Sequence, residues 1–451
     1  MKKKIIGILI CILLIAVAIP VAGTTEVTIK RESKVTRGDL LDSGWIEERD
    51  GVTILHLNGS NYEMGYQHGS LLKDEIIENM RMISIWFEKM GFSYDVFLEI
   101  WDVMKGFLPQ GYKDEMQGMA DGLGVSFEEV TVYNTWPAVI NHVFVSCCGS
   151  ASWDSATVDD KLYHMRSLDI LHPVHDIKDP DTGTYFRENQ VLIVRKPDNR
   201  YASFYPASAG AIYSWRGINE KGIAIGANTC LTYDSTFYGI SAAFRMRMVL
   251  DYAATAEEAI NIINSKRTCG WNFIISDGKI PKGYVIEQTA NLVYVGTWFD
   301  PVESTDPFWK IEDVIRRCPM FISPVCSATQ QQRKYYDPSG LRGFLMFLMG
   351  KNMYFTVWNK YRALSKEFEK QWGTLDLNST MSLLRDVYLG KTDFLFYLMQ
   401  KFRSYKALHQ WGACPETGDM VISFADADNE TACENPTHYF KLSELLEAEL
   451  P

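Results

Sequence analysis

The stretch VSCCGSASWDSATVDDKLYHMRSLDI, residues 145–170, contains two adjacent cysteines at the start of a predicted strand. Two short extended runs flank a turn at Asp159 and Asp160, so the stretch predicts a β-hairpin. Successive side chains of a strand point to opposite faces of its sheet, so Cys147 and Cys148 cannot bridge each other within regular strand geometry. At least one of the two therefore has another partner or another role.

The N-terminus carries the features of a secretory signal. Lysines occupy residues 2–4, an apolar run fills residues 5–21, and small residues follow. The run reaches only the lower limit of the length that spans a bilayer, so an uncleaved N-terminal anchor stays open beside a cleaved signal. In both cases we expect an exported protein, secreted or extracytoplasmic, that touches a membrane only through an uncleaved N-terminal segment.

The composition excludes several classes of partner. The chain has 451 residues and a formal net charge of −11 without a basic block, which argues against binding to nucleic acid and against electrostatic docking on anionic lipid. No low-complexity stretch indicates disorder, and no second apolar run of membrane-spanning length occurs. The part that follows the signal is long enough for one large domain or two medium ones.

The hydrophobic pattern changes along the chain. Apolar residues recur every three or four positions from Met64 to Phe87, which predicts a helix, and Ser60 with Glu63 has capping-box spacing. Downstream, hairpin signals alternate with helical segments, and residues 340–405 are again helical. This order of strands, helices and further strands predicts a layered α+β protein rather than a βαβ repeat.

Cysteine usage leaves two interpretations open. One of the nine cysteines, Cys11, lies in the N-terminal apolar run, and the others are Cys147, Cys148, Cys230, Cys269, Cys318, Cys326, Cys414 and Cys433. In an exported protein the ordinary expectation is disulfides, with Cys318–Cys326 and Cys414–Cys433 as loop staples, although spacing cannot fix connectivity. A chain with all of these cysteines paired would be a non-catalytic cell-surface module.

A cysteine at the first position of a strand can instead be the residue that autocatalytic cleavage exposes. Its freed α-amine, with a reference pKa of about 8, can act as the base for its own thiol. An Asp can accept from the ammonium form of that amine, and an Arg can keep the thiolate charged. Arg166 and Asp169 are the candidates for these roles. The chemistry needs donors for an oxyanion but neither a metal nor an organic cofactor.

Two other kinds of site find no support in the sequence. His164, His172 and His175 lie near Asp169, but their spacing matches neither a helical His-x-x-x-His pair nor a zinc pattern. No Gly-x-Ser-x-Gly elbow occurs, which removes that type of serine hydrolase.

Four motifs follow one another along the chain. They are SNYEMGYQHGSLL (60–72), CCGSASWDSATVDDKLYHMRSLD (147–169), GINEKGIAIGANT (217–229) and GWNFIISDGKIPKGYVIE (270–287). Together they resemble the isopenicillin-N (6-aminopenicillanic acid) acyltransferase-like family, whose relatives include choloylglycine hydrolases and acid ceramidase. Residues 360–388 also fit the C-terminal helices of that family. The resemblance implies a cysteine N-terminal-nucleophile hydrolase with a four-layer αββα sandwich.

The resemblance also implies which residues carry the chemistry. When Trp153 and the Arg166–Asp169 motif are matched to the family pattern, the nucleophile falls on Cys147, and Cys148 takes the place of a serine or threonine. A shift of one residue in the hairpin would make Cys148 the nucleophile. Arg166 and Asp169 match the pair that flanks the nucleophile in that family.

Two asparagines complete the implied site. Asn228 matches a residue that holds the substrate or the oxyanion, and Asn272 matches a strand asparagine assigned to the oxyanion hole. Without the family context, both side chains would be expected to bond to the backbone of turns.

The sequence therefore predicts a signal or anchor (1–23), a mainly helical N-terminal part (24–146) and a catalytic part (147–451). The precursor would cleave itself before Cys147, and the two chains would stay associated. The expected substrate is a small linear, non-peptide amide, with a lipid-like acyl chain as one option, whose acyl group passes to water or to an acceptor amine. A lipid-directed esterase or phospholipase on the same fold is the alternative enzyme, favoured if the Met- and Phe-rich helices of residues 340–405 line the pocket.

Overall fold

A computed structural model describes residues 43–140, 147–331, 339–403 and 405–450. The predicted signal or anchor at residues 1–23 lies outside the described residues, as does the peptide bond before Cys147. Within the described part of the chain, no helix is both long enough and apolar enough to cross a membrane.

A nine-stranded sheet, sheet A, forms the first half of the core. In spatial order its strands are β1 (Trp45–Arg49), β2 (Val52–Gly59), β5 (Gln190–Pro197), β6 (Ser203–Ser208), β7 (Arg216–Asn219), β8 (Ile223–Thr229), β9 (Trp271–Asp277), β10 (Lys282–Gln288) and β11 (Val293–Gly296). Neighbouring strands are antiparallel except for β2 and β5, which pair in parallel from Ile54 opposite Leu192 to Gly59 opposite Pro197. The N-terminal part thus contributes two strands to the same sheet as the predicted catalytic part.

A six-stranded antiparallel sheet, sheet B, forms the second half. In spatial order its strands are β12 (Val314–Arg317), β3 (Cys148–Asp154), β4 (Asp160–Leu171), β13 (Tyr405–Cys414), β14 (Asp419–Phe424) and β15 (His438–Lys441). Strands β3 and β4 are the hairpin predicted at residues 145–170, and the chain turns back between Asp154 and Asp160, both at positive φ.

The two sheets pack face to face. One buried cluster joins Ile54, Val194 and Phe204 of sheet A to Trp411 and Met420 of sheet B. A second cluster joins Trp153 and Leu162 of sheet B to Ile274 and Val285 of sheet A. These alternating apolar side chains exclude water between the sheets and stabilise the sandwich.

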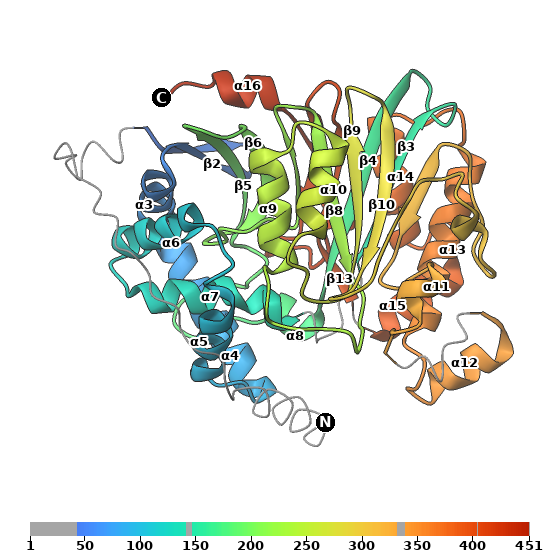
Figure 1. Cartoon of the computed structure of the whole chain (residues 1–451), viewed down its shortest axis with the longest axis horizontal. Coiled ribbons are helices and arrows are strands. Elements are labelled where there is room, and N and C mark those ends of the chain that lie inside the picture. Colours follow the sequence, from blue (N-terminus) through green and yellow to red (C-terminus); the bar gives the residue numbers. More distant parts are fainter. Residues whose placement is uncertain (1–42, 141–146, 332–338, 404, 451) are drawn as a thin grey trace. The chain divides into compact units, whose positions relative to one another are not determined.

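Helices cover both outer faces (Figure 1). Sheet A shares one hydrophobic cluster with α3 (Asn61–Leu71), α4 (Lys73–Met90), α5 (Tyr94–Met104), α6 (Gln110–Leu123), α7 (Phe127–Ile140), α9 (Ala242–Tyr252) and α10 (Ala256–Asn264). Sheet B packs against α13 (Tyr354–Lys370), α14 (Leu377–Tyr388) and α15 (Phe394–Arg403). Shorter elements are α8 (His172–His175), α11 (Pro324–Ser327), α12 (Gly340–Leu348), α16 (Leu442–Glu447) and the 3-10 helices η1 (Pro301–Ser304) and η3 (Ala432–Glu434). The predicted α+β, four-layer αββα architecture is confirmed.

The first motif, SNYEMGYQHGSLL, has a structural role. Ser60 caps α3 in a complete capping box with Glu63, as predicted. The glycines of the motif let α3 and α6 approach closely, because a Cβ on Gly65 would lie 1.9 Å from the main-chain oxygen of Glu115. The motif therefore holds two helices together rather than forming a catalytic element.

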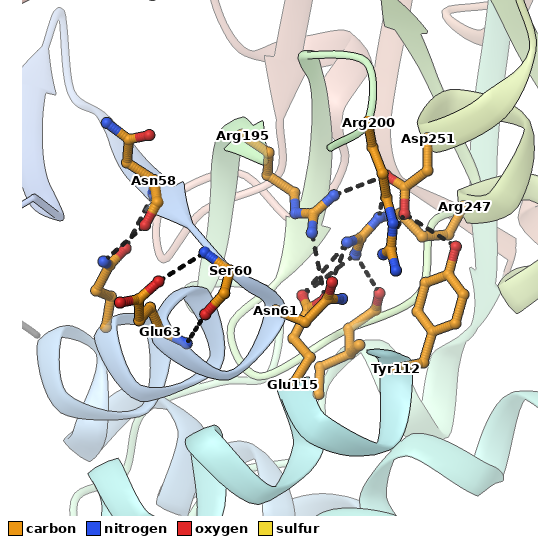
Figure 2. Close-up of polar contacts among 12 residues, drawn as sticks. Asn58, Ser60, Asn61, Glu63, Tyr112, Glu115, Arg195, Arg200, Arg247 and Asp251 are labelled. Carbon is orange, nitrogen blue, oxygen red and sulfur yellow. Dashed lines mark hydrogen bonds and ion pairs between the residues drawn. The ribbon is translucent and has the colours of Figure 1, made fainter. Parts of the chain in front are cut away.

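A network of buried charges ties α6 to sheet A and α9 (Figure 2). Arg195 of β5 donates to Glu115 at 3.2 Å and to Asp251 at 2.8 Å. Arg247 of α9 donates to the same two carboxylates at 3.0 and 3.1 Å, and the hydroxyl of Tyr112 donates to Asp251 at 2.9 Å. Each buried positive charge of this network has a buried carboxylate as its partner, which is the condition for burying charge without a large loss of stability.

The expected disulfide staples are absent. All eight cysteines of the described residues are buried thiols, so Cys318–Cys326 and Cys414–Cys433 are not bonded in this structure. Cys318 packs in the core between sheet B and its helices, whereas Cys326 packs in a separate small cluster with Cys230. Proximity in sequence did not bring these thiols together, because β12 and α11 direct them into different clusters.

Candidate active site

The two adjacent cysteines point to opposite sides of sheet B, as strand geometry requires. Cys147 directly precedes β3 and packs in the cluster that contains Leu168 and Ile170, whereas Cys148 packs with Met165 against the outer helices. The two thiols therefore have different environments.

Arg166 contacts the thiol of Cys147. Its Nη2 lies 3.4 Å from the Sγ of Cys147, and its Nε donates to the main-chain oxygen of Ala227 at 2.6 Å, which orients the guanidinium. Burial raises the pKa of the Cys147 thiol, and the positive charge of Arg166 acts against that rise. Arg166 is thus placed to stabilise a thiolate at Cys147.

Asp169 presents its main chain to Cys147 and its carboxylate to other residues. The main-chain oxygen of Asp169 lies 4.0 Å from the Sγ of Cys147. Its carboxylate accepts from Ser167 Oγ at 2.6 Å, from Lys360 Nζ at 2.5 Å and from Tyr388 Oη at 2.6 Å. Asp169 is fully buried, and these three hydrogen bonds, one of them from the charged Lys360, compensate for the loss of water around its carboxylate.

Lys360 and Tyr388 were not singled out as site residues from the sequence. Lys360 is 1% exposed and its Nζ lies 3.1 Å from the hydroxyl of Tyr388. Burial acts to lower the pKa of Lys360, but Asp169, together with the thiols of Cys148 and Cys318, holds that pKa above its usual value. The sequence did offer a clue to Lys360, which lies between the buried residues Val357 and Tyr361 of α13. A lysine is seldom buried without a partner, so its position among apolar residues indicates a buried ion pair.

Cys148 lies on the same side as this network. Its Sγ is 3.3 Å from the hydroxyl of Tyr388, and burial raises the pKa of the thiol to about 12. A thiol in this environment stays protonated at neutral pH, which makes Cys148 a poor nucleophile in this conformation.

The two predicted asparagines are neighbours in sheet A. Asn228 of β8 lies opposite Asn272 of β9, and a Cβ placed on Gly149 would lie 3.9 Å from Nδ2 of Asn228. The amide of Asn228 donates to the main-chain oxygen of Arg317 at 3.1 Å. The amide of Asn272 donates to the main-chain oxygen of Cys318 at 2.9 Å and to that of Met320 at 2.7 Å. Asn228 therefore holds the end of β12 and Asn272 holds the segment that follows it, and within the described residues neither side chain forms a hydrogen bond with Cys147.

His164, one of the histidines considered as metal ligands, has another role. The Nδ1 of His164 lies 2.8 Å from Ser276 Oγ, its ring stacks on Trp411, and burial lowers its pKa to about 3. Throughout the described residues, no group of three or more His, Cys, Asp or Glu side chains is arranged to hold a metal ion.

The chain is a four-layer αββα sandwich in which Cys147 directly precedes strand β3. Residues 178–291 match the model of the acyl-coenzyme A:6-aminopenicillanic acid acyl-transferase family, which confirms the resemblance drawn from the sequence motifs. Family and fold together support an N-terminal-nucleophile hydrolase or acyltransferase.

Curated relatives are distant. An uncharacterized protein of Archaeoglobus fulgidus is 28% identical over 64% of this chain and 51% of its own length. Protein dcd1A of Dictyostelium discoideum is 24% identical over 82% of each chain, and dcd1B of the same organism is 24% identical over 58% of this chain and 55% of its own. The chain thus spans about half the length of two of these relatives.

Two similar solved structures are enzymes. A Caenorhabditis elegans ortholog of N-acylethanolamine-hydrolyzing acid amidase is 14% identical, with 60% of this chain and 93% of that chain covered and a TM-score of 0.34. A variant of conjugated bile acid hydrolase from Clostridium perfringens is also 14% identical, with 66% and 93% covered and a TM-score of 0.39.

Proposed function

We propose that this chain is an exported, self-processing cysteine hydrolase or acyltransferase that acts on a linear, non-peptide amide, with Cys147 as nucleophile. The observation that carries the proposal is the buried contact between Arg166 Nη2 and Cys147 Sγ at the first residue before a central strand. The family match and the fold support the general reaction type, and the identity of the nucleophile rests on this contact.

The reaction follows from the state of the Cys147 thiol. In the uncut chain burial raises its pKa, so the thiol is protonated and needs a base. Cleavage before Cys147 would supply an α-amine with a pKa of about 8 on the same residue. The amine takes the thiol proton, the thiolate attacks the amide carbonyl, and the ammonium returns the proton to the leaving amine. Water, or an acceptor amine, then releases the acyl group from the thioester.

Arg166, Asp169 and Asn228 have separate roles in the proposed reaction. Arg166 stabilises the thiolate, and Asp169, held by Lys360, fixes the chain beside Cys147. Asn228 is the better oxyanion donor, because the structure records one protein acceptor for its two amide hydrogens, whereas Asn272 uses both of its hydrogens on main-chain oxygens.

Self-processing is tested by intact mass and N-terminal sequencing of the exported protein. We expect a new N-terminus at Cys147 in the wild type and in Cys148→Ala, and a single uncut chain in Cys147→Ala. Cys148→Ala is the matched control, since it removes the adjacent thiol from the other face of the sheet. A new N-terminus at Cys148 would move the nucleophile by one residue, and an uncut wild-type chain would contradict the mechanism.

No specific observation favours either alternative, the lipid-directed esterase or phospholipase or the non-catalytic disulfide-bonded module. A lipid-directed enzyme would be favoured if the helices of residues 340–405 lined the pocket, but among the described residues the cavity lined by Leu168 and Arg216 has no wall from α12, α13, α14 or α15. The disulfide-bonded module is tested by counting thiols after denaturation, and eight paired cysteines would overturn the enzyme proposal.

A further inference from the structure

Arg216, the first residue of β7, carries a buried positive charge that lacks a carboxylate partner. It is 0% exposed, and no ion pair to it is recorded in the described part of the chain. Its Nη2 donates to the main-chain oxygen of Pro206 at 3.2 Å and contacts Nε2 of His409. Its Nε and Nη1 have no hydrogen-bond partner among the described residues.

The neighbours of Arg216 do not compensate its charge. His409 is held neutral, because burial and then Arg216 and Arg166 lower its pKa well below the usual value, so it can only accept a hydrogen bond from Arg216. Burial and the neighbouring guanidinium of Arg166 likewise lower the pKa of Arg216 well below its usual value. A buried guanidinium with two unbonded nitrogens and a like-charged neighbour is costly, unless an anion occupies the site during function.

Arg216 lines a small cavity on the Cys147 side of sheet B. Its walls include the aromatic side chains of Trp136, Tyr213 and Trp215, together with Leu168 from the same strand as Arg166. Cys147 belongs to the same buried cluster as these wall residues. A cavity with apolar walls and one fixed polar group is the usual form of a small-molecule site.

We propose that Arg216 binds a carboxylate, and that the amide cleaved at Cys147 therefore carries a carboxylate beside an apolar group, as an N-acyl amino acid does. A guanidinium recognises a carboxylate through charge-assisted hydrogen bonds, and Nε and Nη1 supply the donors. The cavity in the present conformation has room for about one water molecule, so the carboxylate enters as wall side chains such as Trp215, which is 9% exposed, rotate away. The statement that the bound carboxylate belongs to the substrate rests on the proposed function, whereas binding at Arg216 does not.

The test is calorimetric binding to the full chain carrying Cys147→Ala, which prevents turnover. The ligands are phenylacetate and hexanoate, each compared with its uncharged primary amide. We expect each carboxylate to bind about tenfold or more tightly than its amide, and Arg216→Met to abolish that preference. Arg216→Lys, which keeps the charge but not the planar fork, is expected to retain part of it.

Arg245→Met is the matched control, because Arg245 is equally buried, bonds to the main-chain oxygen of Ile240 and lies in α9 outside the walls of this cavity. This variant should keep the carboxylate preference. The proposal is overturned if no carboxylate binds, if acid and amide bind equally, or if the preference survives in Arg216→Met that circular dichroism shows to be folded. Carboxylate binding through Arg216, combined with a wild-type chain that stays uncut before Cys147, would support the anion site and contradict the proposed catalysis.

Discussion

Two buried groups of arginines contrast in how their charges are balanced. Arg195 and Arg247, where the N-terminal helices meet sheet A, each pair with both Glu115 and Asp251. Arg166 and Arg216, near Cys147, are equally buried, but no carboxylate pairs with them within the described residues. The first group has its negative charge built in and serves stability. We propose that the second receives negative charge from a thiolate or a ligand, because perturbed charges cluster at functional sites.

The largest expected effect comes from removing a built-in counter-charge. Asp251→Asn leaves Arg195 and Arg247 short of one carboxylate, and we expect the free energy of unfolding in urea to fall by about 3–5 kcal/mol. The control is Asp102→Asn, which breaks the exposed pair with Lys105 and should cost no more than about 1 kcal/mol. Equal losses in the two variants would show that burial does not distinguish these pairs.

Protonation of His68, which lies near Arg195 and Arg247, should lower the stability of the folded protein as the pH falls. His68 accepts from the main-chain nitrogen of Gly210 at 3.0 Å, and burial, with the charges of Arg195 and Arg247, lowers its pKa to about 3. The unfolded chain binds this proton below about pH 6.5, while the folded chain resists it until about pH 3, so stability is present above that window and is lost as pH falls through it.

The expected slope for His68 alone is about 1.4 kcal/mol per pH unit between pH 6 and pH 4. Urea unfolding at several pH values measures this slope. The side chain of His68→Gln can still accept from Gly210 but cannot be protonated, so the free energy of unfolding of this variant should fall less steeply with pH, by that amount. Parallel curves for the two proteins would contradict a neutral buried His68.

Arg166→Met should lower stability less than Asp251→Asn does and should change the reactivity of Cys147. Since Arg166 has no carboxylate to leave behind, we expect a stability loss of about 2 kcal/mol or less, mainly from the hydrogen bond to Ala227. The pKa of Cys147 should rise, because the charge that favours its thiolate is gone.

Iodoacetamide labelling of Cys147, followed by peptide mass spectrometry across pH, measures that rise. The labelling curve of Arg166→Met should move to higher pH, whereas Cys148, on the other face, should keep its own curve. A loss of stability as large as that of Asp251→Asn, or an unchanged Cys147 curve, would remove the distinction between the two groups.

Local sequence patterns predicted much of the fold and some of the site. The hairpin of residues 145–170, the capping box at Ser60 and the opposite directions of Cys147 and Cys148 depend only on turn chemistry and strand geometry, and all are found. The contact of Arg166 with Cys147 followed from the family pattern within one hairpin.

Long-range contacts could not be predicted in the same way. Lys360 meets Asp169 across a separation of 191 residues, and Arg216 meets His409 across 193, because they lie on elements that only the assembled sandwich brings together. The two asparagines show a different limit of sequence-based prediction. The family pattern identifies Asn272, but it does not reveal that both amide hydrogens of this residue bind the backbone after β12.

The parallel pairing of β2 with β5 has a consequence for assembly kinetics. Strand β2 sits between β1 and β5, so the N-terminal part forms one edge of sheet A and joins it through residues 54–59. In an uncut precursor this pairing is an intramolecular event whose rate does not depend on protein concentration. If the chain is cut before Cys147, as we propose, the same pairing becomes a bimolecular encounter, so refolding of the cut protein should slow on dilution while refolding of uncut Cys147→Ala should not.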